Sequence, residues 1–147
     1  IIIAEIERMK HRVVNHFILP DSKSFYRSGY IGPATSRVME LLNAHPVVAE
    51  KKSYMKVQTI LFGDLEKVWK RHLIYMLRNR RNIDPEIIFV AYVGMTHQQQ
   101  ETLRKIINQN FEFTQVVFHK ASFSSSCNSG YNTVGIAFLR KSTDMLT

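Results

Sequence analysis

The sequence is short of cysteine and of long apolar stretches. Cys127 is the single cysteine, so the chain cannot form an internal disulfide, which fits a reducing, cytoplasmic setting. No run of about eighteen apolar residues occurs, which argues against a membrane-spanning helix. The sequence opens on Ile1-Ile2-Ile3, without a basic leader or a methionine. We therefore expect no secretory signal, and we expect the chain to be a piece of a longer protein.

The sequence also lacks the residue spacing of a metal site or a catalytic centre. None of its six histidines pairs with another at a metal-binding spacing on a helix with a carboxylate nearby. One alternative is a cysteine-dependent enzyme, with Cys127 as nucleophile beside His119 or His97. No third group is placed to orient such a base. We predict no metal, no cofactor and no catalysis.

Positive charge, in contrast, is abundant. Twenty Lys and Arg residues face twelve Asp and Glu residues, which gives a formal net charge of +8. This balance favours acidic partners, whether nucleic acid, anionic lipid or an acidic protein face. The 147 residues suffice for one domain with a real core and are few for two.

Hydrophobic periodicity predicts alternating strands and helices. The clearest helix covers about residues 65–80, with an apolar stripe of Val68, Trp69, His72, Leu73, Met76 and Leu77. Thr96 and Gln99 form a capping box for a further helix. Other helices are expected at 1–12 and from Pro33 to Leu42, with Val38, Leu41 and Leu42 on the apolar side of the latter. We expect strands at 13–19, 46–49, 54–61, 86–93, 113–119 and 133–139.

These elements predict an α/β fold, a two-layer sandwich of a mixed sheet with helices mainly on one face. The nearly continuous apolar run at 86–93 is typical of a central strand that is buried on both sides or close to it. The strand–helix–strand stretch from Glu86 to His119 favours a crossover unit with parallel strands.

The most informative segment is polar and lies just before the last strand. Ser126, Asn128, Ser129 and Gly130 form a predicted loop whose small residues let a ligand approach the backbone. Such a loop suits an oxygen-rich head group at the end of a sheet. The alternative is a polar turn whose side chains satisfy their own backbone.

The helix at 65–81 carries a basic set, Lys67, Lys70, Arg71, Arg78, Arg80 and Arg81. A solvated outer face explains such a set most simply. A functional explanation is docking of an acidic partner, where complementary charge mainly raises the association rate. A nucleic-acid-binding module built on this helix is the alternative function, although no aromatic side chains are expected to interleave with the basic ones.

Four segments follow one another along the chain: residues 17–32, which end in Gly29-Tyr30-Ile31-Gly32, residues 41–47, which hold Leu41, Asn43 and Pro46, the basic residues 67–71, and the polar loop and strand at 128–138. Through these segments the chain resembles, from about residue 13 to 140, the C-terminal half of the DegV family, the bacterial fatty-acid-binding proteins. The first is similar to the family's segment that usually ends in Gly-Gly-Arg-Ile, and the second to its leucine, asparagine and proline segment. The third falls at its basic helix start, and the fourth is similar to its closing glycine-rich loop and strand.

This resemblance implies a lipid carrier and not an enzyme. A two-domain protein would wrap one long-chain fatty acid between its halves and present the carboxyl group to a separate fatty acid kinase. Residues 1–12 would be the helix that links to a missing N-terminal domain, and residues 13–147 the C-terminal lipid-binding domain. Ser126, Asn128, Ser129 and Gly130 would hold the head group, and Arg27, Lys67, Lys70 and Arg71 would dock the kinase catalytic subunit.

Two positions depart from the family pattern. Tyr30 stands where the family usually has Arg, so that basic contact is absent. Asn128 stands where many members have His, and an amide cannot act as a base. We therefore expect Asn128 to orient a head group and not to transfer a proton.

Overall fold

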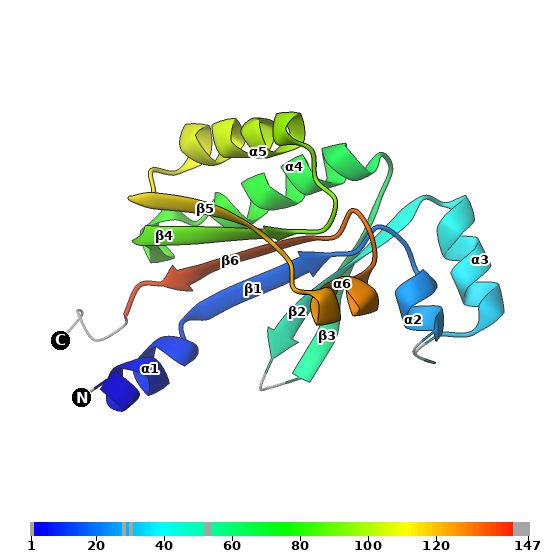
Figure 1. Ribbon diagram of the computed structural model, residues 1–147, viewed down its shortest axis with the longest axis horizontal. Coiled ribbons are helices and arrows are strands. Elements are labelled where there is room, and N and C mark those ends of the chain that lie inside the picture. Colours follow the sequence, from blue (N-terminus) through cyan, green and yellow to red (C-terminus); the bar gives the residue numbers. More distant parts are fainter. Residues whose placement is uncertain (1, 28, 30, 52–53, 143–147) are drawn as a thin grey trace.

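One mixed β-sheet with helices packed on it forms the fold (Figure 1). The computed structural model describes residues 2–27, 29, 31–51 and 54–142. Its sheet has the strand order β3-β2-β1-β6-β4-β5. The strands are β1 (Val13–Ile18), β2 (Ala44–Lys51), β3 (Tyr54–Phe62), β4 (Ile83–Tyr92), β5 (Gln115–Lys120) and β6 (Val134–Arg140). The helices are α1 (Ile2–Lys10), α2 (Lys23–Arg27), α3 (Pro33–Leu41), α4 (Leu65–Leu77), the 3-10 turn η1 (Arg80–Asn82), α5 (His97–Asn110) and α6 (Phe123–Ser129).

Helix α4 begins and faces the sheet as its sequence predicts. Asp64 caps its amino end by accepting a hydrogen bond from the Lys67 backbone N–H. All six residues of the predicted apolar stripe are buried. The helix ends at Leu77 and not near Arg80, because the chain turns through η1 into β4. Arg80 and Arg81 therefore do not extend the basic face of α4.

The predicted crossover unit is confirmed. β4 and β5 pair in parallel, with α5 connecting them on the same face of the sheet as α4 (Figure 1). Thr96 and Gln99 form the capping box at the start of α5 through reciprocal side-chain bonds to backbone N–H groups. Leu103 and Ile107 are buried, so the helix packs by the residues that its periodicity predicts.

The hydrophobic core lies between the sheet and these two helices. Ile88, Ile136 and Ile18, from three neighbouring strands, are fully or almost fully buried there. Leu73 of α4 and Ile107 of α5 meet them from the helix layer. The observed architecture is the predicted α/β sandwich with a mixed sheet.

Burial departs from prediction on one strand and one helix. β4 is central but is fully buried on one side only, since Ile88 is inaccessible whereas, on the other side, Ile87 and Ala91 are half-buried and Phe89 is 38% exposed. α3 does not bury its apolar side, and Leu41 is 86% exposed. Its buried residue is Ser36, whose hydroxyl shares a 2.9 Å hydrogen bond with that of Ser22. The buried side-chain contact of α3 is therefore polar.

In the described part of the chain, no helix combines the length and the apolar character needed to cross a bilayer.

Candidate functional site

The predicted head-group residues lie in and just after the short helix α6. The Ser126 backbone N–H donates to the Ser122 carbonyl (2.9 Å), and the Gly130 N–H donates to the Ser126 carbonyl (3.0 Å). The predicted loop is therefore wrong for Ser126, Asn128 and Ser129, which are helical. Gly130 ends the helix with a φ of +88°, a conformation that favours glycine.

The four residues differ in what they offer to a ligand. The Ser126 hydroxyl donates to the Ser122 carbonyl (2.8 Å), so its proton is used within the helix and its oxygen can only accept. Asn128 is exposed, and within the described residues its amide has no partner. Of this set, Asn128 has the side-chain donors that are free to meet a carboxylate. Its contact with a ligand stays a prediction.

Backbone hydrogen bonds hold the end of α6 against β4. The Asn132 N–H donates to the Val93 carbonyl (2.8 Å), and the Val93 N–H donates to the Thr133 carbonyl (3.0 Å). The buried hydroxyl of Thr133 donates to the Ser129 carbonyl (2.8 Å), near the end of α6. The helix is thus fixed to the sheet although its own sequence is a weak helix former.

A glycine–tyrosine contact supports the same corner. Gly94 has a φ of +75°, and a Cβ added there would lie 2.0 Å from the ring of Tyr131. The ring therefore needs the bare backbone of residue 94. Sequence reasoning missed both residues, because nothing in the local pattern ties a residue after β4 to one after α6.

This corner is the carboxyl end of the central strands. β1 and β4 both pair antiparallel with β6, and Ile18 and Tyr92 both lie opposite Val134. The end of β5 joins them through the bond from the Ala121 N–H to the Tyr92 carbonyl (2.8 Å). Ligands of open α/β sheets bind most often beyond the carboxyl ends of strands. The polar residues of α6 thus lie where such a site is expected.

The sheet face turned away from α4 and α5 is mostly apolar, and most of its residues are half-buried, with Val13 and Phe89 exposed and Gly135 buried. Because Ile18, Ile88 and Ile136 point into the core, their strand neighbours point to the opposite face. Strand pairing brings those neighbours together, with Phe17 opposite Gly135 and Phe89 opposite Ala137. The face comprises Val13, Asn15, Phe17, Ile87, Phe89, Ala91, Val117, Gly135, Ala137 and Leu139, with Gln115 and His119 of β5 at its edge, and we call it the open face.

Small residues run along the middle of the open face. Gly135 and Ala137 of β6 lie between the larger residues of β1 and β4. A Cβ at Gly135 would lie 2.8 Å from the Phe17 ring, so the ring lies against bare backbone. α1 and α6 lie on this side of the sheet, near its two ends, and leave the middle uncovered (Figure 1). A long apolar surface thus leads to the polar residues of α6.

The predicted docking residues separate into two groups. Lys67 and Arg71 are exposed on α4, and Lys70 is half-buried between them. The Arg71 Nη2 donates to the Phe62 carbonyl (2.7 Å) at the end of β3. Arg27 ends α2, which lies beyond the carboxyl end of β1 and away from α4 (Figure 1).

A histidine pair lies on the closed side of the sheet, within the packing between β1 and α4. His16 Nδ1 and His72 Nε2 are 2.9 Å apart. Burial lowers the pKa of His72 to about 4, with the charge of His16 as a smaller cause. Burial also lowers the pKa of His16, with Arg140 contributing less. Both rings are neutral at neutral pH, and the pair takes no part in the open face.

The described residues offer no support for a cysteine enzyme or a metal centre. Cys127 is exposed and makes no hydrogen bond there. The ring of His119 packs edge-on against Phe89 with centroids 6.3 Å apart, and His97 begins α5. No group of three or more potential metal ligands gathers in the described part of the chain.

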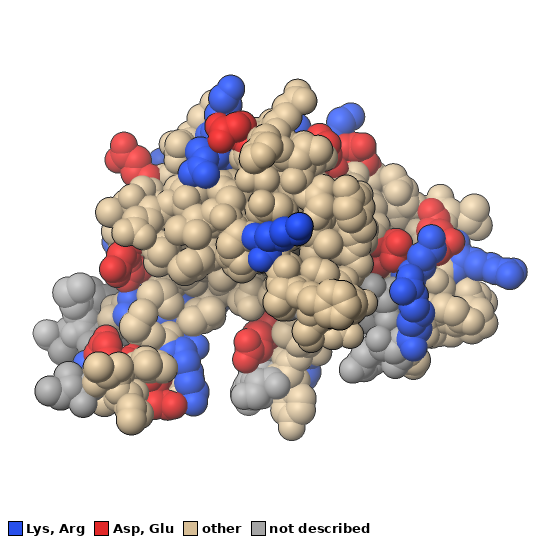
Figure 2. Space-filling view, in the orientation of Figure 1, with Lys and Arg blue, Asp and Glu red and all other residues tan. Residues whose placement is uncertain are grey.

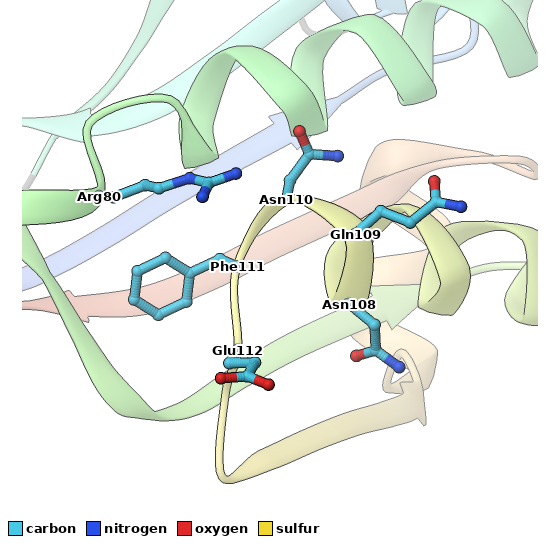
Figure 3. Close-up of a pocket in the computed structure, with 6 residues that line it drawn as sticks. All are labelled: Arg80, Asn108, Gln109, Asn110, Phe111 and Glu112. Atoms are coloured by element: carbon cyan, nitrogen blue, oxygen red, sulfur yellow. The ribbon is translucent and has the colours of Figure 1, made fainter.

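A shallow pocket of about 360 Å³ lies at the other end of the helix layer (Figure 3). It is formed where α5 ends, beside η1, and is lined by Arg80, Asn108, Gln109, Asn110, Phe111 and Glu112. Arg80 and Glu112 are the charged residues of its lining, and their charges are opposite, so the pocket has no net charge that would favour an anion or a cation. The pocket lies at the amino end of β5, whereas α6 follows its carboxyl end. The pocket and the α6 residues are therefore at opposite ends of this strand and do not form one site.

Comparison with solved structures identifies the fold. A DegV-family protein from Eubacterium eligens, loaded with heptadecanoic acid, matches 94% of this chain at a TM-score of 0.75 and 13% identity. The fatty acid kinase (Fak) B3 protein of Streptococcus pneumoniae, loaded with linoleic acid, matches 95% at a TM-score of 0.76 and 13% identity. A fatty-acid-binding DegV-family protein from Thermus thermophilus matches 95% at a TM-score of 0.69 and 18% identity.

The matches cover only part of those proteins. The chain spans 49% of the first two and 50% of the third. No family model matches the sequence, and no curated protein matches it. The resemblance to the DegV family seen in the sequence is thus confirmed at the level of three-dimensional structure, and the fold of this chain is that of one half of a DegV-family protein.

Proposed function

We propose that this chain is the C-terminal half of a fatty-acid-binding protein and that the open face forms one wall of the lipid site. The observation that carries the proposal is an uncovered apolar face in a fold whose solved counterparts are twice as long and hold fatty acids. The other wall would be an N-terminal domain, linked through α1. A reducing, cytoplasmic setting belongs to the same proposal.

The apolar surface must supply most of the affinity. Each buried methylene contributes roughly 0.8 kcal/mol, so a chain of about sixteen carbons gains on the order of 10 kcal/mol. A hydrogen bond from Asn128 contributes only about 1 kcal/mol, or somewhat more to a charged carboxylate. The acyl chain would therefore lie along the open face, and the α6 residues would orient the carboxyl group outward.

Native mass spectrometry of the full-length protein purified from cells tests this proposal. We expect an acyl chain to be bound, and Phe89→Glu should abolish its retention because the charge enters the apolar wall. Ile74→Glu is the matched control, since Ile74 is an exposed apolar residue (44%) on the other side of the sheet. Protein that stays lipid-free even when offered long-chain acids would overturn the proposal.

The role of Asn128 is tested in the same preparation. Asn128→Leu should leave the total bound lipid nearly unchanged, because the apolar wall is intact. It should disorder the carboxyl group, which a ¹³C-carboxyl NMR signal of labelled acid would report. An unchanged carboxyl signal would remove Asn128 from the site.

Presentation of the carboxyl group to a kinase is the finer part of the proposal. Lys67, Lys70 and Arg71 lie together on α4 and would meet an acidic partner, with Arg27 contributing from α2. We do not favour nucleic acid as the partner, although the expectation of no interleaved aromatic residue is wrong. Tyr75 lies among the basic residues, half exposed, with the Arg78 guanidinium 4.2 Å above its ring. Its face towards Arg78 is thereby occupied and is not free to stack on a base.

A further inference from the structure

We propose that the free edge of β3, together with the outer side of α4, binds an acidic extended segment of a partner protein by strand addition. The surface comprises Lys56, Ile60 and Phe62 of β3, Lys67 and Arg71 of α4, and Arg78, the residue that caps the carboxyl end of α4. This inference extends the docking part of the proposed function and does not depend on a bound lipid.

The strand pairing shows which backbone groups of β3 face outward. Ala44 lies opposite Phe62, and the Gly63 N–H donates to the Asn43 carbonyl (3.0 Å). In an antiparallel ladder this bond marks a pair that exchanges no hydrogen bonds of its own. The N–H and carbonyl of Phe62 therefore point away from β2, and the bond from Arg71 to the Phe62 carbonyl agrees with this.

Ile60 faces the same way. It lies two residues before Phe62 and opposite Pro46, which has no N–H to donate. The Pro46 carbonyl accepts from the Leu19 N–H (2.9 Å), so it points towards β1 and away from β3. The N–H and carbonyl of Ile60 are thus turned to the free edge. An added strand would pair with these groups.

The side chains of β3 do not protect this edge. β3 is the outermost strand, and four of its apolar residues, Met55, Val57, Ile60 and Phe62, are exposed, whereas Leu61 packs against the core. Lys56 is the one charged residue of the strand. The tip of the β2–β3 hairpin, where β3 begins, projects from the rest of the molecule with open space beside it (Figure 2). Natural sheets usually guard such an edge with charges or a cover, so an exposed apolar edge indicates a binding surface.

The side of α4 next to this edge selects the charge of the partner. Lys67, Arg71 and Arg78 are separated by four and seven residues, so they share one side of the helix. The bond from Arg71 to Phe62 places that side beside β3. The acidic residues near the amino end of α4 are occupied elsewhere, since Asp64 caps the helix and Glu66 accepts from Gln99. The surface therefore suits alternating acidic and apolar side chains.

A second copy of the chain is a poorer occupant. Each copy would bring the same four cations, Lys56, Lys67, Arg71 and Arg78, to the shared edge. The whole chain carries a net charge of +8, so the copies repel each other at low salt.

Fluorescence anisotropy with a labelled peptide tests the proposal. The probe is a nine-residue peptide, the length of β3, that alternates Glu with Val and Thr. We expect it to bind the 147-residue chain, with or without lipid, and to bind more weakly as salt rises. A peptide with Lys in place of Glu should not bind.

Ile60→Pro separates strand addition from simple charge attraction. It removes only an N–H that points outward, so β2 keeps its bonds and proline is tolerated at such an edge. We expect the affinity for the acidic peptide to fall at least about tenfold. Ile60→Ala removes the same side chain but keeps the N–H, and it should bind nearly as well as the wild type. Circular dichroism and amide exchange in β2 verify that both variants fold.

Charge reversal provides the second arm. Lys67→Glu with Arg78→Glu should also weaken binding by about tenfold. Equal binding by Ile60→Pro and Ile60→Ala would overturn strand addition. If the acidic peptide does not bind at low salt, the partner is not an acidic segment. Self-association of the chain that Ile60→Pro abolishes would show that a second copy occupies the edge, and it would also overturn the proposal. Each of these outcomes leaves the lipid content measured by mass spectrometry unaffected, so the lipid proposal is judged separately.

Discussion

The two faces of the sheet are similar in composition and opposite in environment. Under α4 and α5, Ile88 and its neighbours are inaccessible to solvent, whereas Phe89 and Val13 on the open face remain exposed. Both faces carry aliphatic and aromatic side chains. The chain thus buries one of its two apolar layers and leaves the other partly solvated. The face under α4 and α5, here called the closed face, forms the hydrophobic core of the domain.

The largest expected effect comes from two adjacent residues of β4. Ile88→Ala on the closed face should lower the free energy of unfolding by about 2–5 kcal/mol, because it leaves a cavity in the core. Phe89→Ala on the open face should cost well under half as much, since 38% of the side chain is already solvated. Urea denaturation of both variants measures the difference. Equal losses would show that the open face is packed and would break the comparison.

The sequence predicted the closed face well. Helix α4 carries six apolar or aromatic residues at helical spacing, and all six are buried. The capping box at Thr96 and the parallel crossover were also confirmed. These features depend on neighbours a few residues apart, where periodicity and side-chain chemistry act directly.

The errors arise where burial depends on a distant or absent surface. Leu41 of α3 has the apolar character of a core residue, yet it is exposed, because periodicity shows which residues share a face and not what covers it. Phe89 is the equivalent case on a strand, since it lies in an apolar run and is nevertheless exposed. The helical state of Ser126 was missed because α6 is stabilised by distant contacts, such as the backbone bonds of Asn132 and Thr133 to Val93, and not by helix propensity.

The second prediction concerns pH and the closed face alone. His72 is neutral in the fold, with its pKa lowered to about 4 from 6.5. Between pH 6.5 and about pH 4, His72 is therefore protonated in the unfolded chain and neutral in the folded chain. The contribution of neutral His72 to the free energy of unfolding is therefore fully present above pH 6.5, and it is lost as the pH drops towards 4. The loss should be on the order of 3 kcal/mol.

Urea denaturation at a series of pH values measures this loss. His72→Gln is the informative variant, because an amide can keep a hydrogen bond to His16 and does not titrate. Its stability should depend less on pH in this range, although His16 still titrates. A variant as acid-sensitive as the wild type would show that protonation disturbs some other part of the closed face.

The third prediction compares two glycines that have positive φ. Gly94→Ala should cost about 1–3 kcal/mol, because the methyl group must displace the Tyr131 ring in addition to straining the backbone. Gly63→Ala bears backbone strain alone, since nothing lies within 4 Å of a Cβ there. The excess loss for Gly94, measured by thermal denaturation, is the contribution of the contact between Gly94 and Tyr131. Equal losses would mean that this contact does not hold α6 to the sheet.

The smallest expected effect isolates a single hydrogen bond at the border between the two faces. Thr133 is buried, and its hydroxyl donates to the Ser129 carbonyl near the end of α6. Thr133→Val removes the donor at nearly constant volume and should cost about 1 kcal/mol. Thr133→Ser keeps the donor, so amide exchange at Gly130 should stay at the wild-type rate in this control variant.

If α6 is held mainly by this bond, the valine variant should have faster amide exchange at Gly130 while the Ile88 amide stays protected, because the core of the closed face does not depend on α6. Faster exchange at both residues would mean that the polar corner and the core open together, and the two faces would then form one cooperative unit.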